Sequence, residues 1–233
     1  MFGYAKALQL VFNLVAVNAT PQESFSTRMN SRWKLNEGET YGEVEAIYFT
    51  WEDATFVFLE VDKYGIAWPK GRNLDHRYYI RLYGLLAAAY NYRQALDHLA
   101  RLSKFQQRKQ LIQQVDSCKV IQVRHLLASH PLNATSENRS QQTRLIQLTL
   151  DTNEIQFVSE DQLGKLRVPT DLLTCYTVMN EATYDLIKYA ATHWLDSKSN
   201  AARDALQQIE AGRTHFDRYL KTYAYADKAT SAY

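Results

Sequence analysis

The sequence predicts a mainly α-helical protein, a bundle of helices with one β-hairpin inserted between two of them. Three observations predict this class. Apolar residues recur at spacings of three and four over several long stretches. Glycine and proline, which interrupt helices, number only 8 and 4 in 233 residues. The content of 46% hydrophobic and 22% charged residues is typical of a globular chain that fills a core, in one domain or one domain with an appended arm.

The expected elements of the first part of the chain are helices separated by polar stretches. Residues 43–62 have the β-branched and aromatic content of strands, but their apolar residues follow a helical stripe, so we expect a helix there. Asp75 has the side chain of an N-cap and begins a long helix that reaches about Ser103, with Tyr83 and Tyr90 among the residues of its apolar stripe. The expected order is a helix over 4–17, a loop over 20–39, a helix over 43–62, a loop over 64–74 and a helix over 75–103.

The second part continues this pattern around one pair of strands. A polar link over 104–109 leads into a second strong helix over 110–129, which Pro131 ends because the residue before a proline avoids helical dihedral angles. The expected elements that follow are a loop over 133–142, strands over 144–150 and 155–159 joined by a turn at Asp151-Thr152-Asn153-Glu154, a helix from its N-cap Asp171 to about Leu195, and a last helix over about 201–225.

Charge and cysteine content limit the classes of function. The net charge of +2 is too small to indicate a nucleic-acid binder by itself, so any RNA contact would come from a local cluster. Cys118 and Cys175 lie far apart in different expected helices, so we expect neither a disulfide framework nor a cysteine zinc site, and a reducing cytosol fits. The sequence contains neither glycine-rich phosphate loops nor an apolar run of about 18 residues, the length of a membrane span. We therefore expect a cytoplasmic protein with no membrane partner.

A secreted protein is the alternative location. Residues 7–19 are fairly apolar and end in Val17-Asn18-Ala19, a possible signal-peptidase site. Asparagines 18, 133 and 138 begin Asn-x-Ser/Thr sequons, which would matter only in a secreted chain. The charge before the apolar run is limited to Lys6, and Gln9 and Asn13 interrupt it, so an amphipathic N-terminal helix is the preferred interpretation.

The candidate catalytic residues lie at the end of the helix expected over 110–129. Arg124 offers a planar, permanently charged fork that suits phosphate oxygens. His130 titrates near neutrality and so can act as acid or base. Cleavage of RNA without a metal needs a base for the 2′-hydroxyl, an acid for the leaving oxygen and a cation for the phosphate. The alternative is structural, with Arg124 in a salt bridge and His130 as a C-terminal helix cap.

The spacing of this pair is not specific. Arg93 and His98 form a second match in the same chain, and such a match is expected about once by chance. On a regular helix the side chains of Arg124 and His130 would lie roughly 120° apart, so only a helix that ends at His130, or a partner subunit, would bring them together. A metal site is not expected, because His125 and His130 are five residues apart rather than the four that place two ligands on one helix face.

The setting of the pair carries a family resemblance. The chain resembles HEPN-domain proteins, small helical bundles that often dimerise and carry an Arg-x(4–6)-His motif late in a helix that follows another long helix. The residue after the arginine is commonly polar in that family, and here it is His125. The run from Arg124 to Asn133, Arg-His-x-x-x-Ser-His-x-x-Asn, is similar to a subset linked to phage defence and toxin modules. The run Tyr-Ile-Arg-Leu-Tyr-Gly-Leu-Leu at 79–86 is similar to the preceding helix of such proteins.

The resemblance covers roughly residues 75–195 and implies a division of the chain. Residues 75–233 are expected to form the HEPN-like bundle, and residues 1–74, which match nothing in the family, an accessory helical and loop region. It also implies a homodimeric endoribonuclease without metal or cofactor, whose two motifs face one cleft. Arg124 would hold the scissile phosphate and His130 would be the general base or acid. His125 and Asn133 would orient or assist, and an antitoxin or another regulatory protein is the expected partner.

Two further arginines are expected to bind RNA. Arg77 and Arg81 lie one turn apart among Tyr78, Tyr79 and Tyr83, a combination that suits contact with phosphates and stacking on bases. The alternative is a solvated face whose arginines extend their charged ends into water. The alternative function is a non-catalytic binding or regulatory module on the same helical scaffold.

Overall fold

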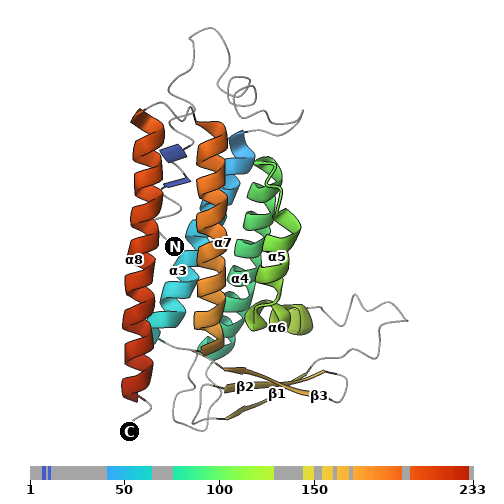
Figure 1. Cartoon of the computed structure of the whole chain (residues 1–233). Helices are drawn as coiled ribbons and strands as arrows, with labels where there is room; N and C mark the ends of the chain where they lie inside the picture. The colour runs from blue at the N-terminus through green and yellow to red at the C-terminus, as the bar shows by residue number, and fades with distance from the viewer. Residues whose placement is uncertain are drawn as a thin grey trace, which may run out of the picture.

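A computed structural model gives the structure of the chain and confirms the mainly helical class. It describes residues 7, 8, 10, 11, 41–64, 76–128, 144–149, 154–159, 162–167, 170–195 and 200–230. The helices are α3 (Tyr41–Tyr64), α4 (His76–Leu102), α5 (Arg108–Asp116), α6 (Lys119–Ala128), α7 (Thr170–Trp194) and α8 (Asn200–Thr230), and the strands are β1 (Arg144–Thr149), β2 (Glu154–Ser159) and β3 (Gln162–Arg167). Figure 1 shows the long helices side by side, with the sheet beyond one end of the bundle and next to α6.

Aromatic side chains form the centre of the core. Trp51 of α3 stacks on Tyr92 of α4, with ring centroids 5.5 Å apart, and Phe58 lies between Tyr92 and Tyr176 of α7. The Thr183 hydroxyl donates its one hydrogen to the Met179 carbonyl, so the Tyr92 hydroxyl must be the donor in its 2.6 Å bond to Thr183. The surrounding apolar cluster contains residues of all six helices, Leu166 of β3, and Ala7, Leu8 and Val11. The regions before and after residue 75 therefore share one core.

The predicted long helices are confirmed, including the ambiguous one. Residues 43–62 are helical as part of α3, and their apolar stripe is buried at Val44, Ile47, Trp51 and Phe58. Helices α4, α7 and α8 cover the stretches predicted at 75–103, 171–195 and 201–225. Four residues of the helix predicted over 4–17 are described, at 7, 8, 10 and 11, and all four are helical. The loops predicted over 20–39 and 133–142, and most of the one over 64–74, lie outside the described residues, as does Asp75.

Two details of these helices differ from the prediction. Tyr83, placed on the apolar stripe of α4, is 47% exposed. It lies two residues before the buried Leu85, and two residues of a helix span about 200°, so the two side chains point to opposite faces. Asp171 is not the N-cap of α7, because the helix begins at Thr170. Its carboxylate instead accepts a 2.7 Å hydrogen bond from the Arg167 backbone N–H, and it lies 3.7 Å from the ammonium of Lys119.

The prediction of one continuous helix over 110–129 is wrong, because the chain breaks into α5 and α6 at Ser117 and Cys118. The Ser117 hydroxyl donates to the Gln114 carbonyl (2.6 Å), and the Cys118 N–H bonds to the Val115 carbonyl three residues back (3.1 Å). Burial supplies the reason for the break. In a straight helix Val120 would lie about 180° from Leu111. The break turns Val120, Ile121 and Val123 into the core, where all three are fully buried.

The predicted hairpin is confirmed and is extended by a strand that was not predicted. β1 and β2 pair antiparallel from Arg144 opposite Val158 to Thr149 opposite Glu154. β3 then pairs antiparallel with β2, which gives the order β1-β2-β3. The sequence of β3, Gln-Leu-Gly-Lys-Leu-Arg, lacks β-branched and aromatic residues, so local propensity does not indicate a strand. Its pairing with β2 and the full burial of Leu166 stabilise it instead.

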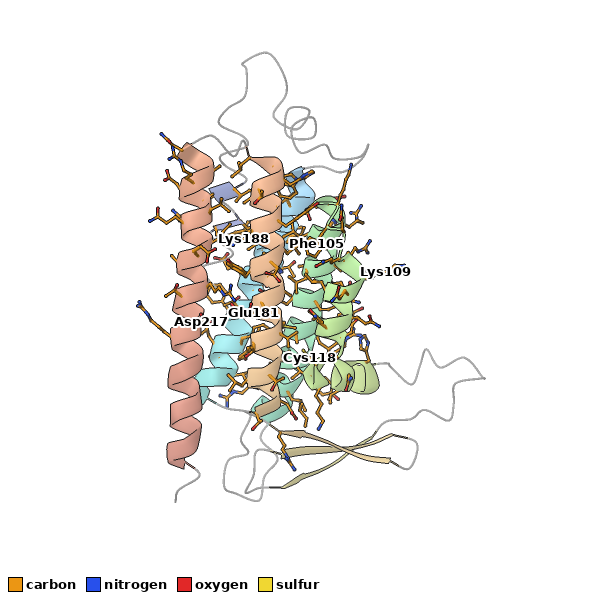
Figure 2. All side chains as sticks on the ribbon, viewed as in Figure 1. Phe105, Lys109, Cys118, Glu181, Lys188 and Asp217 are labelled. Carbon is orange, nitrogen blue, oxygen red and sulfur yellow. The ribbon has the colours of Figure 1, made fainter. Side chains whose placement is uncertain are left out.

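Polar contacts connect α8 to α7. The Tyr184 hydroxyl donates to Glu210 (2.5 Å), and the Lys188 ammonium donates to the same carboxylate (3.0 Å). The Arg213 guanidinium lies 4.4 Å from the centre of the Tyr184 ring and donates to Glu181 (3.1 Å). Figure 2 labels Glu181 and Lys188 on α7, on the side toward α8. The described side chains of α8 that contribute to the apolar contact are the buried Ala202, Ala205 and Ile209 and the partly buried Leu206.

Helix α4 ends in a Schellman motif with a lysine where glycine is usual. The Phe105 N–H bonds to the Ala100 carbonyl (2.9 Å) and the Lys104 N–H to the Arg101 carbonyl (3.1 Å). Lys104 has a φ of 56°, in the left-handed region. The motif shortens the predicted link over 104–109, because it leads directly to α5 at Arg108.

Lys104→Gly should raise the free energy of unfolding by about 0.5–1 kcal/mol. The left-handed conformation costs a residue with a Cβ about 1–2 kcal/mol. This cost exceeds the extra conformational entropy that glycine loses on folding, which amounts to about 0.5–1 kcal/mol. Urea denaturation at neutral pH measures the change. Lys109→Gly, within α5, is the matched control and should lower stability. A loss of stability in both variants would contradict this account of the helix end.

Asn180 is a buried polar side chain to which the described part of the chain offers no hydrogen-bond partner. It is fully buried in α7, and within the described chain neither its amide nitrogen nor its amide oxygen has a hydrogen-bond partner. Asn180→Leu, whose side chain has the same number of heavy atoms and the same branching, should therefore raise the free energy of unfolding by about 1–3 kcal/mol. Thermal and urea unfolding of this variant beside Asn180→Ala, which should leave a cavity, measure the effect. A leucine variant less stable than wild type would refute the assignment of Asn180 as an unsatisfied group.

Candidate functional site

Arg124 and His125 meet Tyr90 at the edge of the bundle. Cys118 immediately precedes α6, and its carbonyl accepts from the N–H groups of Ile121 (2.9 Å) and Gln122 (3.1 Å). The buried valines and isoleucine of α6 fix the helix against α4 and α7, which leaves Arg124 half-buried and His125 exposed. Both side chains contact the ring of Tyr90 on α4. Arg124 and His125, which are neighbours in the sequence, therefore both contact a residue of another helix.

The geometry of this cluster is that of a cation and an imidazole on one aromatic ring. The Arg124 guanidinium carbon lies 3.6 Å from the centroid of the Tyr90 ring. The His125 ring meets the same phenol ring edge-on, with centroids 5.6 Å apart and planes at 88°. The Tyr90 hydroxyl accepts a 2.5 Å hydrogen bond from the Gln94 amide. Stacking of this kind keeps the N–H donors of a guanidinium at its edge, where they suit phosphate oxygens.

The electrostatics of the cluster favour an anion. The α6 sequence, Lys-Val-Ile-Gln-Val-Arg-His-Leu-Leu-Ala, contains no acidic residue. Among the residues that the structure describes, no carboxylate forms an ion pair with Arg124. A positive charge that is half-buried and not matched by a carboxylate attracts phosphate or carboxylate groups of a ligand.

The other predicted site residues are not brought into this cluster by the described structure. His130 and Asn133 lie beyond the end of α6 at Ala128, outside the described residues, as does the side chain of Arg77. Arg81 is half-buried on α4. Its nine-residue separation from Tyr90 places it about 180° around the helix, so Arg81 does not share a face with the Arg124 cluster.

The second arginine–histidine match is engaged in polar contacts with carboxylates. Arg93 donates through Nε and Nη2 to both oxygens of Asp116, at 2.8 Å each. The Nε2 atom of His98 lies 3.0 Å from Glu43 of α3, and the Arg101 guanidinium bonds to the same carboxylate at 3.3 Å. Arg93 thus joins α4 to α5, and His98 joins α4 to α3. These contacts indicate that Arg93 and His98 stabilise the bundle.

Asp97 should make the stability of the bundle fall in acid. Arg108 donates two hydrogen bonds to its carboxylate, at 2.6 and 3.1 Å, and these hold the pKa of Asp97 below its ordinary value. Since the folded pKa is the lower one, this contribution is complete above the unfolded pKa of about 3.9 and is lost as the pH falls through the folded pKa. Asp97→Asn should lower stability by up to about 1 kcal/mol at pH 7 and flatten the decline between about pH 5 and 2. Urea midpoints across this range, with Asp185→Asn as the exposed control, check it; an unchanged slope would contradict it.

A cavity that sequence reasoning missed adjoins the cluster. It lies between α3 and α4, has a volume of about 370 Å³, and is lined by Glu43, Ala46, Ile47, Thr50, Asn91, Gln94, Ala95 and His98. Gln94 connects it to the cluster through the bond to Tyr90. One face of α4 has a polar stripe, because Tyr90, Gln94 and His98 follow one another at intervals of four residues. This stripe is the feature of the sequence that could have indicated the cavity.

The two cysteines interact, although they are far apart in sequence. Cys118 immediately precedes α6 and Cys175 lies in α7; both are free, buried thiols, and their interaction lowers the pKa of Cys118 and raises the pKa of Cys175. Helix packing produces this contact, so the separation of the two residues in different elements did not indicate it. Figure 2 labels Cys118 where α5 and α6 meet beside α7.

Comparisons with known proteins give no relative. No family model, curated protein or solved structure matches the chain. Within the described residues, no group of three or more histidine, cysteine or acidic side chains could hold a metal ion. A search of the same residues finds no helix with the length and apolar character needed to cross a membrane. The site is therefore argued from its own residues.

Proposed function

We propose that the protein is a metal-independent endoribonuclease of the HEPN type. It acts as a cytoplasmic homodimer and as a toxin or phage-defence effector under the control of an antitoxin or another regulatory protein. The observation that supports this most is the cluster of the half-buried Arg124 and the exposed His125 on Tyr90, in the last part of a helix that precedes His130 in the sequence. In the competing pair, Arg93 is held in an ion pair with Asp116, and His98 lies within hydrogen-bond distance of Glu43.

The proposed roles follow the chemistry of each side chain. Arg124 binds the scissile phosphate through its guanidinium edge, and the Tyr90 ring keeps that plane in place. His130 takes the proton of the 2′-hydroxyl or gives one to the leaving 5′-oxygen, and the same residue of the partner copy performs the complementary step. His125 and Asn133 orient the phosphate. The 2′-oxygen displaces the 5′-oxygen, so the products carry a 2′,3′-cyclic phosphate and a 5′-hydroxyl.

Cleavage of RNA in EDTA tests this proposal. Purified wild-type protein should cut single-stranded RNA with the metal chelated, and Arg124→Ala and His130→Ala should not. Arg218→Ala and His193→Ala, which remove exposed side chains from α8 and α7, are the matched controls and should cut normally. End-group analysis should find cyclic phosphates. Equal activity in all five proteins would refute the proposal.

A non-catalytic binding or regulatory module is the second candidate. The small net charge of +2 and the stacking of the Arg124 guanidinium on Tyr90, which is also a stable resting contact, favour it. Expression in a bacterial host separates the two. A nuclease effector should slow growth, and His130→Ala should restore it, whereas a binding module should leave growth the same with either protein.

A further inference from the structure

Two alanines that face each other open the cavity between α3 and α4. Glu43 early in α3 contacts His98 late in α4, so the helices run antiparallel, and Ala46 and Ala95 lie opposite each other one turn further along. Their short side chains leave the volume of about 370 Å³. Small-molecule sites typically have volumes of about 300–1,000 Å³. Ala46 is exposed, so a ligand can enter from solvent.

The polar groups of the cavity lie at its two ends. Glu43 and His98 form one end, and Thr50 and Asn91 form the other, about two helical turns away on each helix. Two turns span roughly 10 Å. The lining between the ends includes apolar side chains, Ala46, Ile47 and Ala95. The cavity therefore suits a ligand with a flat apolar body and polar groups at both ends.

The two ends differ in the hydrogen bonds that they offer. The Oε2 atom of Glu43 accepts from Arg101 (3.3 Å) and lies 3.0 Å from Nε2 of His98, and within the described chain no hydrogen bond reaches Oε1. Since Arg101 already pairs this carboxylate, Oε1 suits a neutral N–H donor rather than a second cation. The amide of Asn91 bonds to no described residue, and its nitrogen can donate two hydrogens.

We propose that this cavity binds a guanine base. Guanine has two N–H donors side by side, at N1 and N2, which face the carboxylate of Glu43. It has two acceptors, O6 and N7, which face the amide of Asn91. Adenine, cytosine and uracil each have an acceptor beside the donor on the corresponding edge, and a carboxylate repels that acceptor. The flat ring fits between Ala46 and Ala95.

In RNA, this guanine belongs to a nucleotide at the site of cleavage, an assignment that rests on the proposed function. Gln94 lines the cavity and donates to the Tyr90 hydroxyl (2.5 Å), and the Arg124 guanidinium lies 3.6 Å from the centre of the Tyr90 ring. The base site and the phosphate site are therefore joined by two side chains. A free guanine nucleotide would make the same contacts.

Binding measurements test the base site without cleavage. Isothermal titration calorimetry of the full-length protein compares GMP with AMP, CMP and UMP, and compares short RNAs whose central nucleotide is one of the four and is 2′-O-methylated. Guanine should bind at least about tenfold tighter than the other bases. IMP, which lacks the N2 amino group, should bind more weakly than GMP. A preference limited to the RNAs would assign the site to an RNA residue alone, and equal binding of all four bases in both series would overturn the proposal.

Two matched pairs of variants locate the site. Glu43→Gln should weaken guanine binding at least about tenfold, and Glu45→Gln, which changes an exposed residue of α3 outside the cavity, should not. Ala46→Leu should fill the cavity and abolish binding, and Ala87→Leu, at an exposed alanine of α4 outside the cavity, should bind as wild type does. Circular dichroism checks the folding of each variant. Undiminished guanine binding in a folded Ala46→Leu variant would place the ligand elsewhere and refute the proposal.

Mapping of RNA cleavage separates this inference from the proposed nuclease function. Wild type should cut next to guanosine, and Glu43→Gln should lose that preference. Cleavage that depends on Arg124 but ignores the base would overturn the guanine site and leave the nuclease in place. Guanine binding without any cleavage would support the guanine site and refute the nuclease.

Discussion

Trp51→Ala should lower the free energy of unfolding by about 3–5 kcal/mol, the range for removing a large aromatic side chain from a packed core. Trp51 is 1% exposed and stacks on Tyr92 with an angle of 21° between the rings. Its loss removes the contact between α3 and α4 at the centre of the bundle and leaves a cavity beside Tyr92. Because the free energy of unfolding of a domain is typically about 5–15 kcal/mol, this change would consume much of the total.

Urea denaturation followed by circular dichroism measures this loss without relying on tryptophan fluorescence. Phe49→Ala is the matched control, since Phe49 lies on the same helix but is 55% exposed, and its effect should stay within about 0.5 kcal/mol. Trp51→Phe should recover part of the stability by restoring a ring. Equal effects of Trp51→Ala and Phe49→Ala would show that the centre of the core is placed wrongly.

Arg124→Lys should reduce RNA cleavage almost as much as Arg124→Ala, by about 10²–10³-fold, although it retains the charge. A lysine ammonium offers neither the planar fork for two phosphate oxygens nor the flat surface that lies 3.6 Å from the Tyr90 ring. The stability of both variants should change little, because an exposed cation–π contact contributes about 0.5–1 kcal/mol. This prediction depends on the proposed nuclease activity.

Initial rates with a fluorescent RNA in EDTA measure the effect, and thermal unfolding checks that each variant is folded. Arg218→Lys on α8 provides the conservative control and should cleave at the wild-type rate. Tyr90→Phe, which retains the ring, should lose much less activity than Tyr90→Leu. Full activity in Arg124→Lys would mean that the site needs only a positive charge, and the bidentate role of Arg124 would have to be abandoned.

The sequence predicted the long helices because their signal is local. In α3, α4, α7 and α8 the apolar residues recur over many turns, and those of successive turns lie on the same face of the helix. The break at Ser117 and Cys118 was missed because Leu111, Val115 and Cys118 continue one stripe up to it. The first apolar residue that departs from this stripe is Val120. Its burial depends on the elements against which α6 packs. Strand β3 was missed for a related reason, since its partner β2 stabilises it.

The candidate site was predictable only in part. Arg124 and His125 stood out by their chemistry, but Tyr90, which holds both, was assigned to the apolar stripe of α4. Tyr90 is half-buried, and its contacts with Arg124 and His125 come from another helix, so its role depends on the angle at which α6 leaves the break. Periodicity within one helix contains no information about such an angle.

The connection of α8 to the bundle implies a hierarchy of stability within one chain. In its described part, α8 contributes only Ala202, Ala205 and Ile209 to the buried interior, and polar groups around Tyr184 and Glu210 form the rest of its contact. Such groups exchange protein partners for water at low net cost. We therefore expect the contacts of α8 that involve these polar groups to open at a lower free-energy cost than the aromatic interior between α3, α4 and α7.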